Sequence, residues 1–232
     1  SDVFDCIERD CPKFLSELRD TYSDYTQLIF RGVKTGSEYP PYLRKKVRKN
    51  RISIDIGESV TNEIDDQLEN KFGVRLRTES SFTSKSYHFA DKFSDAIPNS
   101  TTRPYIFFPI GDYRYFWNTK IIDLFAYLEE QDWFMMYYDE GRYNYDNKEV
   151  VENILFDRGK QKTDPDFEEA LSKIEDEIKG VREKFMSNIS KDYVEGGGFN
   201  EIERQEIAFV CDEYYCIDSI YINDVIEWLY GK

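Results

Sequence analysis

The helical and strand-like segments of this chain follow one another without a repeating order, and this irregularity constrains the fold most. Apolar residues recur at helical spacing behind Pro12, over residues 60–72, and again after Asp164. Short apolar runs of strand character lie between and after them, at residues 105–110 and 207–217. A doubly wound sheet would need a regular alternation of strands and crossover helices. The pattern therefore predicts an α+β fold.

The chain is long enough to fold as one domain without disulfides or metals. It has 232 residues, and aromatic side chains make up 16% of them, which is ample material for a packed core. The sequence predicts a single domain over residues 1–232, opened by a helical segment over residues 1–26. Residues 139–195 are either a helical insertion that forms a lobe or ordinary packing around the fold.

Two further strands are predicted before residue 80. Residues 27–30 are expected to form a short buried strand that ends at Arg31, and residues 74–77 alternate like a second strand. Pro109 is expected to place the end of the strand over residues 105–110 near a sheet edge. The run 207–217 is predicted to be one long strand.

Turn and cap residues give further expectations. Asn118 or Thr119 is expected to cap a helix that carries Leu124 and Leu128 on its apolar side. The three glycines of residues 196–198 are expected to act as a hinge. Residues 221–228 would either finish the sheet or cover it.

Charge is distributed unevenly along this acidic chain. The net charge is −15, so the overall field repels nucleic acids and membrane surfaces. Residues 34–51 instead carry +6, because seven lysines and arginines stand against the single acid Glu38, and the rest of the chain therefore carries −21. This basic island either solvates a loop and offsets neighbouring acids, or it contacts phosphate.

Cysteine and histidine usage argues against a metal centre. The four cysteines form two pairs whose four-residue spacers are at the upper end of the two- to four-residue range of structural zinc sites, and His88 is the single histidine, whereas such sites often recruit histidines. We expect no metal and free thiols in a reducing cytoplasm. His88 is expected to be a partly buried structural residue. No apolar run is long enough to span a bilayer, so no membrane partner is expected.

Three residues at predicted strand ends carry a resemblance to a known family. Arg31, the motif Ser81-Phe82-Thr83 and Glu206 resemble, in this order, the Arg, Ser-x-Thr and Glu set of ADP-ribosyltransferases. Other segments are similar to bacteriophage-encoded proteins assigned to that fold. These segments are residues 29–32, 47–51, 107–111, 115–118, 123–124, 205–207 and 212–215.

The resemblance implies mixed sheets around an NAD cleft with flanking helices. It also implies a mono-ADP-ribosyltransferase that cleaves the nicotinamide–ribose bond of NAD and transfers ADP-ribose to a host macromolecule, either protein or nucleic acid. NAD is then the substrate, and no metal is needed. Glu206 would offset the positive charge that develops on the ribose, as in glycoside cleavage.

Cofactor contacts are implied for several further residues. Arg31 with Gly32 would bind the diphosphate or ribose, since a guanidinium is a planar, permanently charged donor. Ser81 and Thr83 would orient the nicotinamide ribose through hydroxyl hydrogen bonds. The remaining expected contacts are stacking by Tyr87 on nicotinamide and phosphate contacts by Arg48 and Arg51.

One departure from the family pattern bears on the acceptor. Transferases that modify arginine carry a carboxylate or amide two residues before the catalytic glutamate, and that position is Arg204 here. An acceptor of ADP-ribose other than a protein arginine is therefore favoured, such as another protein group, nucleic acid or water. Two alternatives stay open: an NAD glycohydrolase with the same cleft, and a non-catalytic acidic phage inhibitor that mimics nucleic acid and binds a host defence protein.

Overall fold

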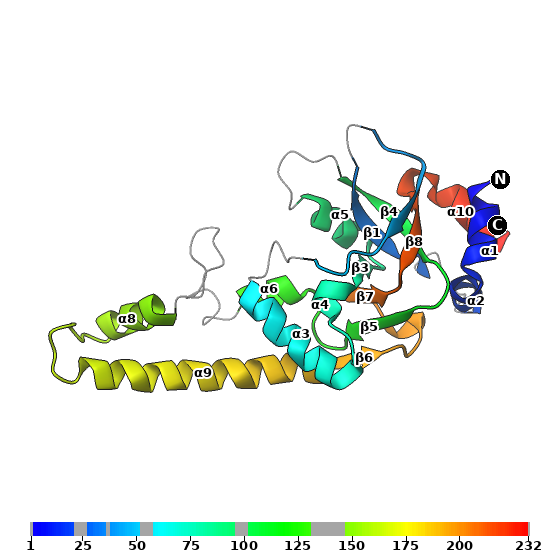
Figure 1. Cartoon of the computed structure of the whole chain (residues 1–232). Coiled ribbons are helices and arrows are strands. Elements are labelled where there is room, and N and C mark those ends of the chain that lie inside the picture. Colours follow the sequence, from blue (N-terminus) through cyan, green and yellow to red (C-terminus); the bar gives the residue numbers. More distant parts are fainter. Residues whose placement is uncertain are drawn as a thin grey trace. The chain divides into compact units, whose positions relative to one another are not determined.

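The structure is a computed structural model that describes residues 2–20, 27–35, 38–51, 58–95, 102–130 and 147–231. It confirms the predicted α+β class, with helices packed on a large antiparallel sheet (Figure 1). The chain divides into two compact units. The first unit contains Ser1–Arg51, Thr78–Ile122 and Tyr193–Lys232, and the second contains Ile52–Arg77 and Asp123–Asp192. The second unit includes most of the segment for which a lobe was one expectation.

The described strands form one eight-stranded sheet, which belongs entirely to the first unit. Its order is β2-β8-β4-β1-β3-β7-β5-β6, and every neighbouring pair with a described register is antiparallel. The strands are β1 (Phe30–Lys34), β2 (Tyr42–Lys46), β3 (Ser81–Ser84), β4 (Thr102–Pro109), β5 (Arg114–Asn118), β6 (Tyr193–Glu195), β7 (Glu206–Val210) and β8 (Glu213–Asp218).

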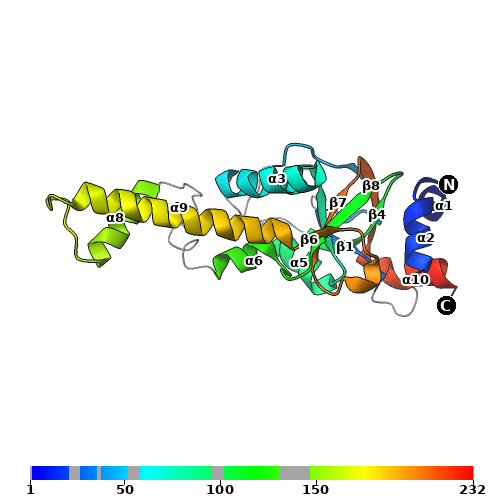
Figure 2. The same ribbon diagram turned by 90° about the horizontal axis from the view of Figure 1, so that it is seen from below.

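Helices of the first unit cover the sheet through an aromatic core. They are α1 (Val3–Asp10), α2 (Pro12–Asp20), α5 (Tyr87–Asp95) and α10 (Ile222–Tyr230), with 3₁₀ turns at Phe199–Glu201 and Ser219–Tyr221. Figure 2 shows α1, α2 and α10 gathered beside the sheet. Phe14 of α2 is fully buried and meets the rings of Phe108, Phe199 and Phe209 at centroid distances of 6.0, 5.7 and 6.1 Å. Trp228 of α10 meets the Phe108 ring of β4 at a centroid distance of 6.0 Å, so residues 222–230 cover the sheet.

The second unit is helical in its described residues. It contains α3 (Glu58–Phe72), α6 (Leu124–Glu129), α8 (Asn147–Asp157) and α9 (Phe167–Lys191), and the short helix α4 (Leu76–Glu79) begins in it. Helix α8 lies along α9 (Figure 1), and their contact is an apolar cluster of Val151, Leu155, Phe167, Leu171 and Ile174. Polar contacts join α3 to α9, including an ion pair of 2.6 Å between Arg182 and Glu63.

Two expected strands of the first half differ from those observed. The strand expected over residues 27–30 begins only at Phe30, so Arg31 lies inside β1 rather than at its end. Residues 74–77 form no strand, because α4 begins at Leu76. The physical reason lies in Asp65, a fully buried side chain whose Oδ1 accepts the backbone N–H of Arg77 at 2.6 Å. A side-chain acceptor at that point stabilises the first turn of a helix.

Two expectations about the sheet are corrected. β4 ends at Pro109 but lies between β8 and β1 in the interior of the sheet, which Pro109 tolerates as the last residue of the strand. The run 207–217 is two strands, β7 and β8, separated in the sheet by β4, β1 and β3. The chain turns between them at Asp212, whose carbonyl accepts the backbone N–H of Val47 at 2.9 Å.

The cap of helix α6 and the glycine segment 196–198 also differ from what the sequence predicts. Helix α6 is capped by Asp123, whose Oδ1 accepts the Ala126 N–H at 3.0 Å, while Asn118 stabilises the turn before it. Residues 196–198 all have positive φ, which glycine adopts readily, but the segment is held to β5. Gly198 N–H donates to the Tyr115 hydroxyl at 2.9 Å, and Trp117 Nε1 donates to the Gly196 carbonyl at 2.9 Å.

The aromatic core predicts a large effect of removing its central ring. Phe14→Ala is expected to lower the free energy of unfolding by about 3–5 kcal/mol, since the buried ring leaves a cavity among other rings. Urea denaturation measures this change. Phe156→Ala is the matched control, because this side chain is 75% exposed and should change stability by less than about 0.5 kcal/mol. Equal effects of the two substitutions would contradict the described core.

Candidate functional site

A row of three residues crosses the neighbouring strands β1, β3 and β7. Phe30 is in register with Ser84, and Ser84 is in register with Glu206. Directly opposed residues of antiparallel strands point to the same face of a sheet. Ser84 is fully buried and Glu206 is 8% exposed, so the carboxylate lies at a largely desolvated position. Segments far apart in the sequence thus bring a hydroxyl and a carboxylate together.

The hydroxyl beside Glu206 is Ser84 rather than the predicted Ser81 or Thr83. Thr83 is in register with Ile207 and Ser81 with Phe209, so both point to the face opposite Glu206. Each is 1% exposed, and Thr83 Oγ1 donates to the Ile207 carbonyl at 3.1 Å. The correction has a simple physical cause. Side chains alternate along a strand, and the sequence motif does not reveal which of its hydroxyls stands opposite the carboxylate.

Arg31 lies beside this row but on the other face of β1. It follows Phe30, and its guanidinium Nη1 donates to the Phe82 carbonyl of β3 at 2.7 Å. The same guanidinium lies 5.3 Å from the ring centroid of Tyr214. Among the described residues of β1 and β3, the backbone register is a single pair, Phe30 with Ser84, so Arg31 adds a side-chain link where that ladder ends. Arg31 and Glu206 therefore do not share one face.

Two other predicted cofactor residues contact residues on the face that carries Glu206. Tyr87, at the start of α5, is 49% exposed and meets the Phe30 ring edge-on at a centroid distance of 5.7 Å. The Arg51 guanidinium lies 4.8 Å from the ring centroid of Phe82, which alternates onto the same face as Ser84. An exposed aromatic ring thus lies at the Phe30 end of the row, and a guanidinium lies near its middle strand β3.

Gly32 and Arg48 complete the predicted set. Gly32 is in register with Pro104 and alternates onto the same face of β1 as Phe30. Arg48 is exposed and follows the end of β2 by two residues.

Lys85 is a structural determinant of this region that sequence reasoning missed. Its ammonium donates to the backbone carbonyls of Phe199 and Ile202 at 2.9 and 2.7 Å, and burial lowers the pKa of Lys85. Ser84 Oγ also donates to the Arg204 carbonyl at 3.3 Å. The end of β3 therefore holds the segment that leads into Glu206. No local pattern marks a lysine for this role.

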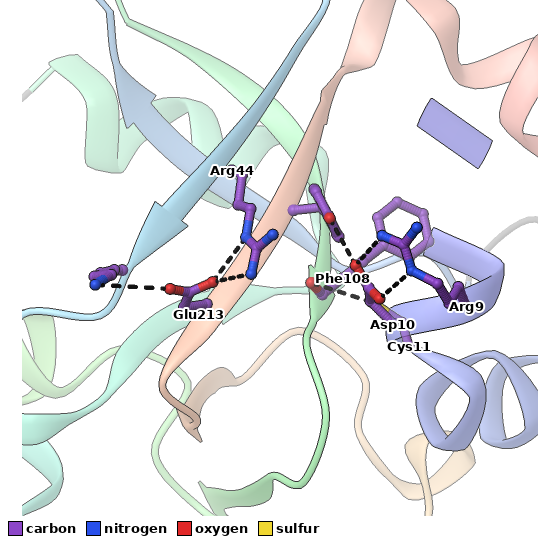
Figure 3. Close-up of polar contacts among 8 residues, drawn as sticks. Arg9, Asp10, Cys11, Arg44, Phe108 and Glu213 are labelled. Atoms are coloured by element: carbon purple, nitrogen blue, oxygen red, sulfur yellow. Dashed lines mark hydrogen bonds and ion pairs between the residues drawn. The ribbon is translucent and has the colours of Figure 1, made fainter. Parts of the chain in front are cut away.

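The basic island is partly compensated by acids, as one of its two interpretations expects. Arg44 Nε donates to Glu213 Oε2 at 2.7 Å, and Lys46 Nζ lies 3.9 Å from Glu213 Oε1 (Figure 3). Lys49 pairs with Asp212 at 3.2 Å. These contacts hold β2 against β8 and its preceding turn, so three cations of the island have structural partners.

A second polar group in Figure 3 ties α1 to the sheet. Arg9 and Asp10 form a two-pronged ion pair of 2.7 and 2.9 Å, and the Tyr215 hydroxyl donates to Asp10 Oδ2 at 2.8 Å. The thiol of the next residue, Cys11, lies 4.0 Å from the Phe108 carbonyl. The Arg9 hydrogen bond, followed by that of Tyr215, lowers the pKa of Asp10 to about 2.

Among the residues that the structure describes, the cysteines and His88 form no further reactive centre. The four cysteines are free, and burial raises the pKa of Cys11, Cys211 and Cys216 to about 12. His88 is exposed rather than partly buried as expected. Within the described ranges, no group of three or more histidine, cysteine, aspartate or glutamate side chains could hold a metal ion.

No protein-family model, curated protein or solved structure matches this chain. Across the part of the chain that the structure describes, no helix combines the length and apolar character needed to cross a membrane.

The pKa of Asp10 predicts a pH dependence of stability. Because its pKa of about 2 in the folded state lies below the unfolded value of about 3.9, its stabilisation is complete above pH 4 and is lost as the pH falls toward 2. Asp10→Asn should flatten the fall of unfolding free energy between pH 4 and 2, measured by urea denaturation. Tyr215→Phe, which removes one of the two contacts, should have a smaller effect. An unchanged slope in Asp10→Asn would contradict the network.

Proposed function

We propose that this protein is an NAD-dependent mono-ADP-ribosyltransferase acting on a host macromolecule. The observation that carries the proposal is the row of Phe30, Ser84 and Glu206 across β1, β3 and β7, with Arg31 next to it. The three segments that resemble the transferase motif are thus neighbours in one sheet. The proposal includes NAD as substrate, a protein or nucleic-acid acceptor, and a cytoplasmic location, where cysteines stay reduced.

Glu206 supplies the chemistry that cleavage of the nicotinamide–ribose bond requires. As the bond breaks, positive charge develops on the ribose, and a fixed carboxylate in a largely desolvated position stabilises that charge more strongly than water does. Nicotinamide is already a good leaving group, so the reaction needs no strong general acid. Ser84, opposite the carboxylate, has the geometry to keep β3 and β7 in register at the reacting bond.

Neighbouring residues suit the other parts of NAD. Tyr87 has an exposed aromatic ring at the Phe30 end of the row, where it can stack on nicotinamide. Gly32 lies on the same face of β1 and lets a ligand approach the backbone closely. The Arg51 guanidinium, which lies over the Phe82 ring on the face of Ser84, is a permanent donor for phosphate or ribose oxygens, whereas Arg31 points to the other face of β1.

The segment before Glu206 favours an acceptor other than arginine. Arg204 is exposed, and the Gln205 side chain is used locally, since its Oε1 accepts the backbone N–H groups of Glu203 and Arg204 at 2.8 and 3.0 Å. Position 204, two residues before Glu206, therefore carries no carboxylate or amide that could deprotonate a guanidinium, and the Gln205 amide is one residue too late. A nucleophile that needs less activation, on a protein or a nucleic acid, fits this arrangement better.

The decisive test is the loss of NAD cleavage in Glu206→Gln. This substitution keeps the size of the side chain but removes its charge, so nicotinamide release should fall about 10²–10³-fold. Radiolabelled NAD and host lysate report label transfer, and chromatography reports nicotinamide.

Glu203→Gln is the matched control, because Glu203 is exposed three residues earlier in the chain, and it should retain activity. Nicotinamide release without label transfer would identify a glycohydrolase. Absence of NAD consumption by the unaltered protein would refute the proposed function.

A further inference from the structure

The strand β2 lies at one edge of the sheet, and β8 is its neighbour among the described strands. Two backbone hydrogen bonds mark the two ends of this pairing. The Val47 N–H donates to the Asp212 carbonyl, and the Asp218 N–H donates to the Pro41 carbonyl, each at 2.9 Å. Along an antiparallel pair, residues that exchange hydrogen bonds alternate with residues that do not. These two bonds therefore determine which residues of β2 bond to β8.

Every second residue of β2 directs its backbone groups away from β8. Leu43 and Lys45 stand at the hydrogen-bonded positions, and Tyr42, Arg44 and Lys46 stand at the positions between them. Among the described strands, none pairs with that outer side of β2. A row of outward N–H and C=O groups on an edge strand is a template on which a further strand can pair.

The side chains of the same three residues share one face of β2. Tyr42, Arg44 and Lys46 alternate onto that face and are all exposed, the Lys46 side chain by 86%. Lys45 points to the other face, where its Nζ donates to the Lys34 carbonyl at 3.4 Å. A strand that paired with this edge would place its own side chains directly opposite the exposed three. An apolar side chain opposite Tyr42 and acids opposite the two cations would match them.

Cations outnumber acids along β2 and the residues that follow it. Residues 42–49 contain five lysines and arginines and no acid, and three of these cations pair with Glu213 or Asp212 (Figure 3). Five cations against two carboxylates leave a local charge of +3, in a chain whose net charge is −15. This surplus favours an acidic partner at the edge of β2.

The same cations disfavour two other occupants. A second copy of this chain, paired through its own β2, would set Arg44 and Lys46 against their equivalents, and like charges on adjacent strands are destabilising. A long nucleic acid would extend beyond the cationic strip into the field of an acidic protein. Its phosphates would also offer no N–H donors to the outward carbonyls of β2.

We propose that the outer edge of β2 binds an extended acidic peptide segment of a partner protein, which adds to the sheet as a strand. The segment runs antiparallel to β2, like the described pairs of this sheet, and presents acids opposite Lys46 and Arg44 and an apolar side chain opposite Tyr42. The inference does not rest on the proposed function, because β8 and β4 separate β2 from β1.

Fluorescence anisotropy of a labelled peptide, titrated with the full chain, tests strand addition. The probe is Thr-Glu-Thr-Glu-Thr-Leu-Thr, whose Glu and Leu residues direct their N–H groups toward β2 in the proposed pairing. N-methylation of these three residues should weaken binding more than about tenfold, since it removes three hydrogen bonds. N-methylation of the three inner and last Thr residues is the matched control. It should change the affinity by less than about threefold, because those N–H groups point away from β2.

A charge reversal on the protein tests the acidic preference. Lys46→Glu should weaken binding of the probe about 3- to 30-fold, because it replaces attraction to a probe glutamate by repulsion. Lys179→Glu on α9 is the matched control, since Lys179 is also exposed and its reversal changes the net charge equally. It should change the affinity by less than about twofold.

The inference is overturned if the unaltered protein does not bind the probe, or if the two N-methylated probes bind equally well. Equal affinities of Lys46→Glu and Lys179→Glu would also overturn it. Lys46-dependent binding of a single-stranded oligonucleotide without binding of the probe would assign the edge to nucleic acid instead. Probe binding with the expected dependences would support strand addition whether or not the protein cleaves NAD, so the two proposals fail separately.

Discussion

The join between β1 and β3 determines how the whole sheet is arranged. β1 carries β4, β8 and β2 on one side, and β3 carries β7, β5 and β6 on the other. Phe30 and Ser84 pair the two strands, and the Arg31 guanidinium then bonds the Phe82 carbonyl. A charge-assisted hydrogen bond is stronger than the backbone bond it accompanies. The Arg31 hydrogen bond therefore supplements a short backbone ladder at this join.

Strand alternation then distributes the functional groups over two faces. Ser84 and Glu206 share the face of Phe30, whereas Arg31 and Lys45 lie on the opposite face. The two sets of groups therefore lie on opposite sides of paired strands.

The sequence predicts elements whose apolar pattern runs over several turns, but it does not predict features that depend on which strands pair with each other. Helices α2, α3 and α9 were predictable because their apolar residues recur over several turns. The break of the run 207–217 at Asp212 was not, since both strands are apolar and the turn depends on a distant partner, Val47. The sequence did not predict that Ser84 rather than Ser81 lies opposite Glu206 for the same reason, because the register depends on both paired strands.

The separation of β7 from β8 has a consequence for how the chain folds. Two strands that follow each other within a few residues lie on opposite sides of β4, β1 and β3, so neither can pair with the other as a hairpin. Each must instead find partners more than a hundred residues earlier in the chain, such as Thr83 for Ile207 and Phe107 for Cys216. Contacts of such long sequence separation are closed slowly. During synthesis, β3 and β4 therefore wait with one unpaired edge each until residues 206–218 emerge.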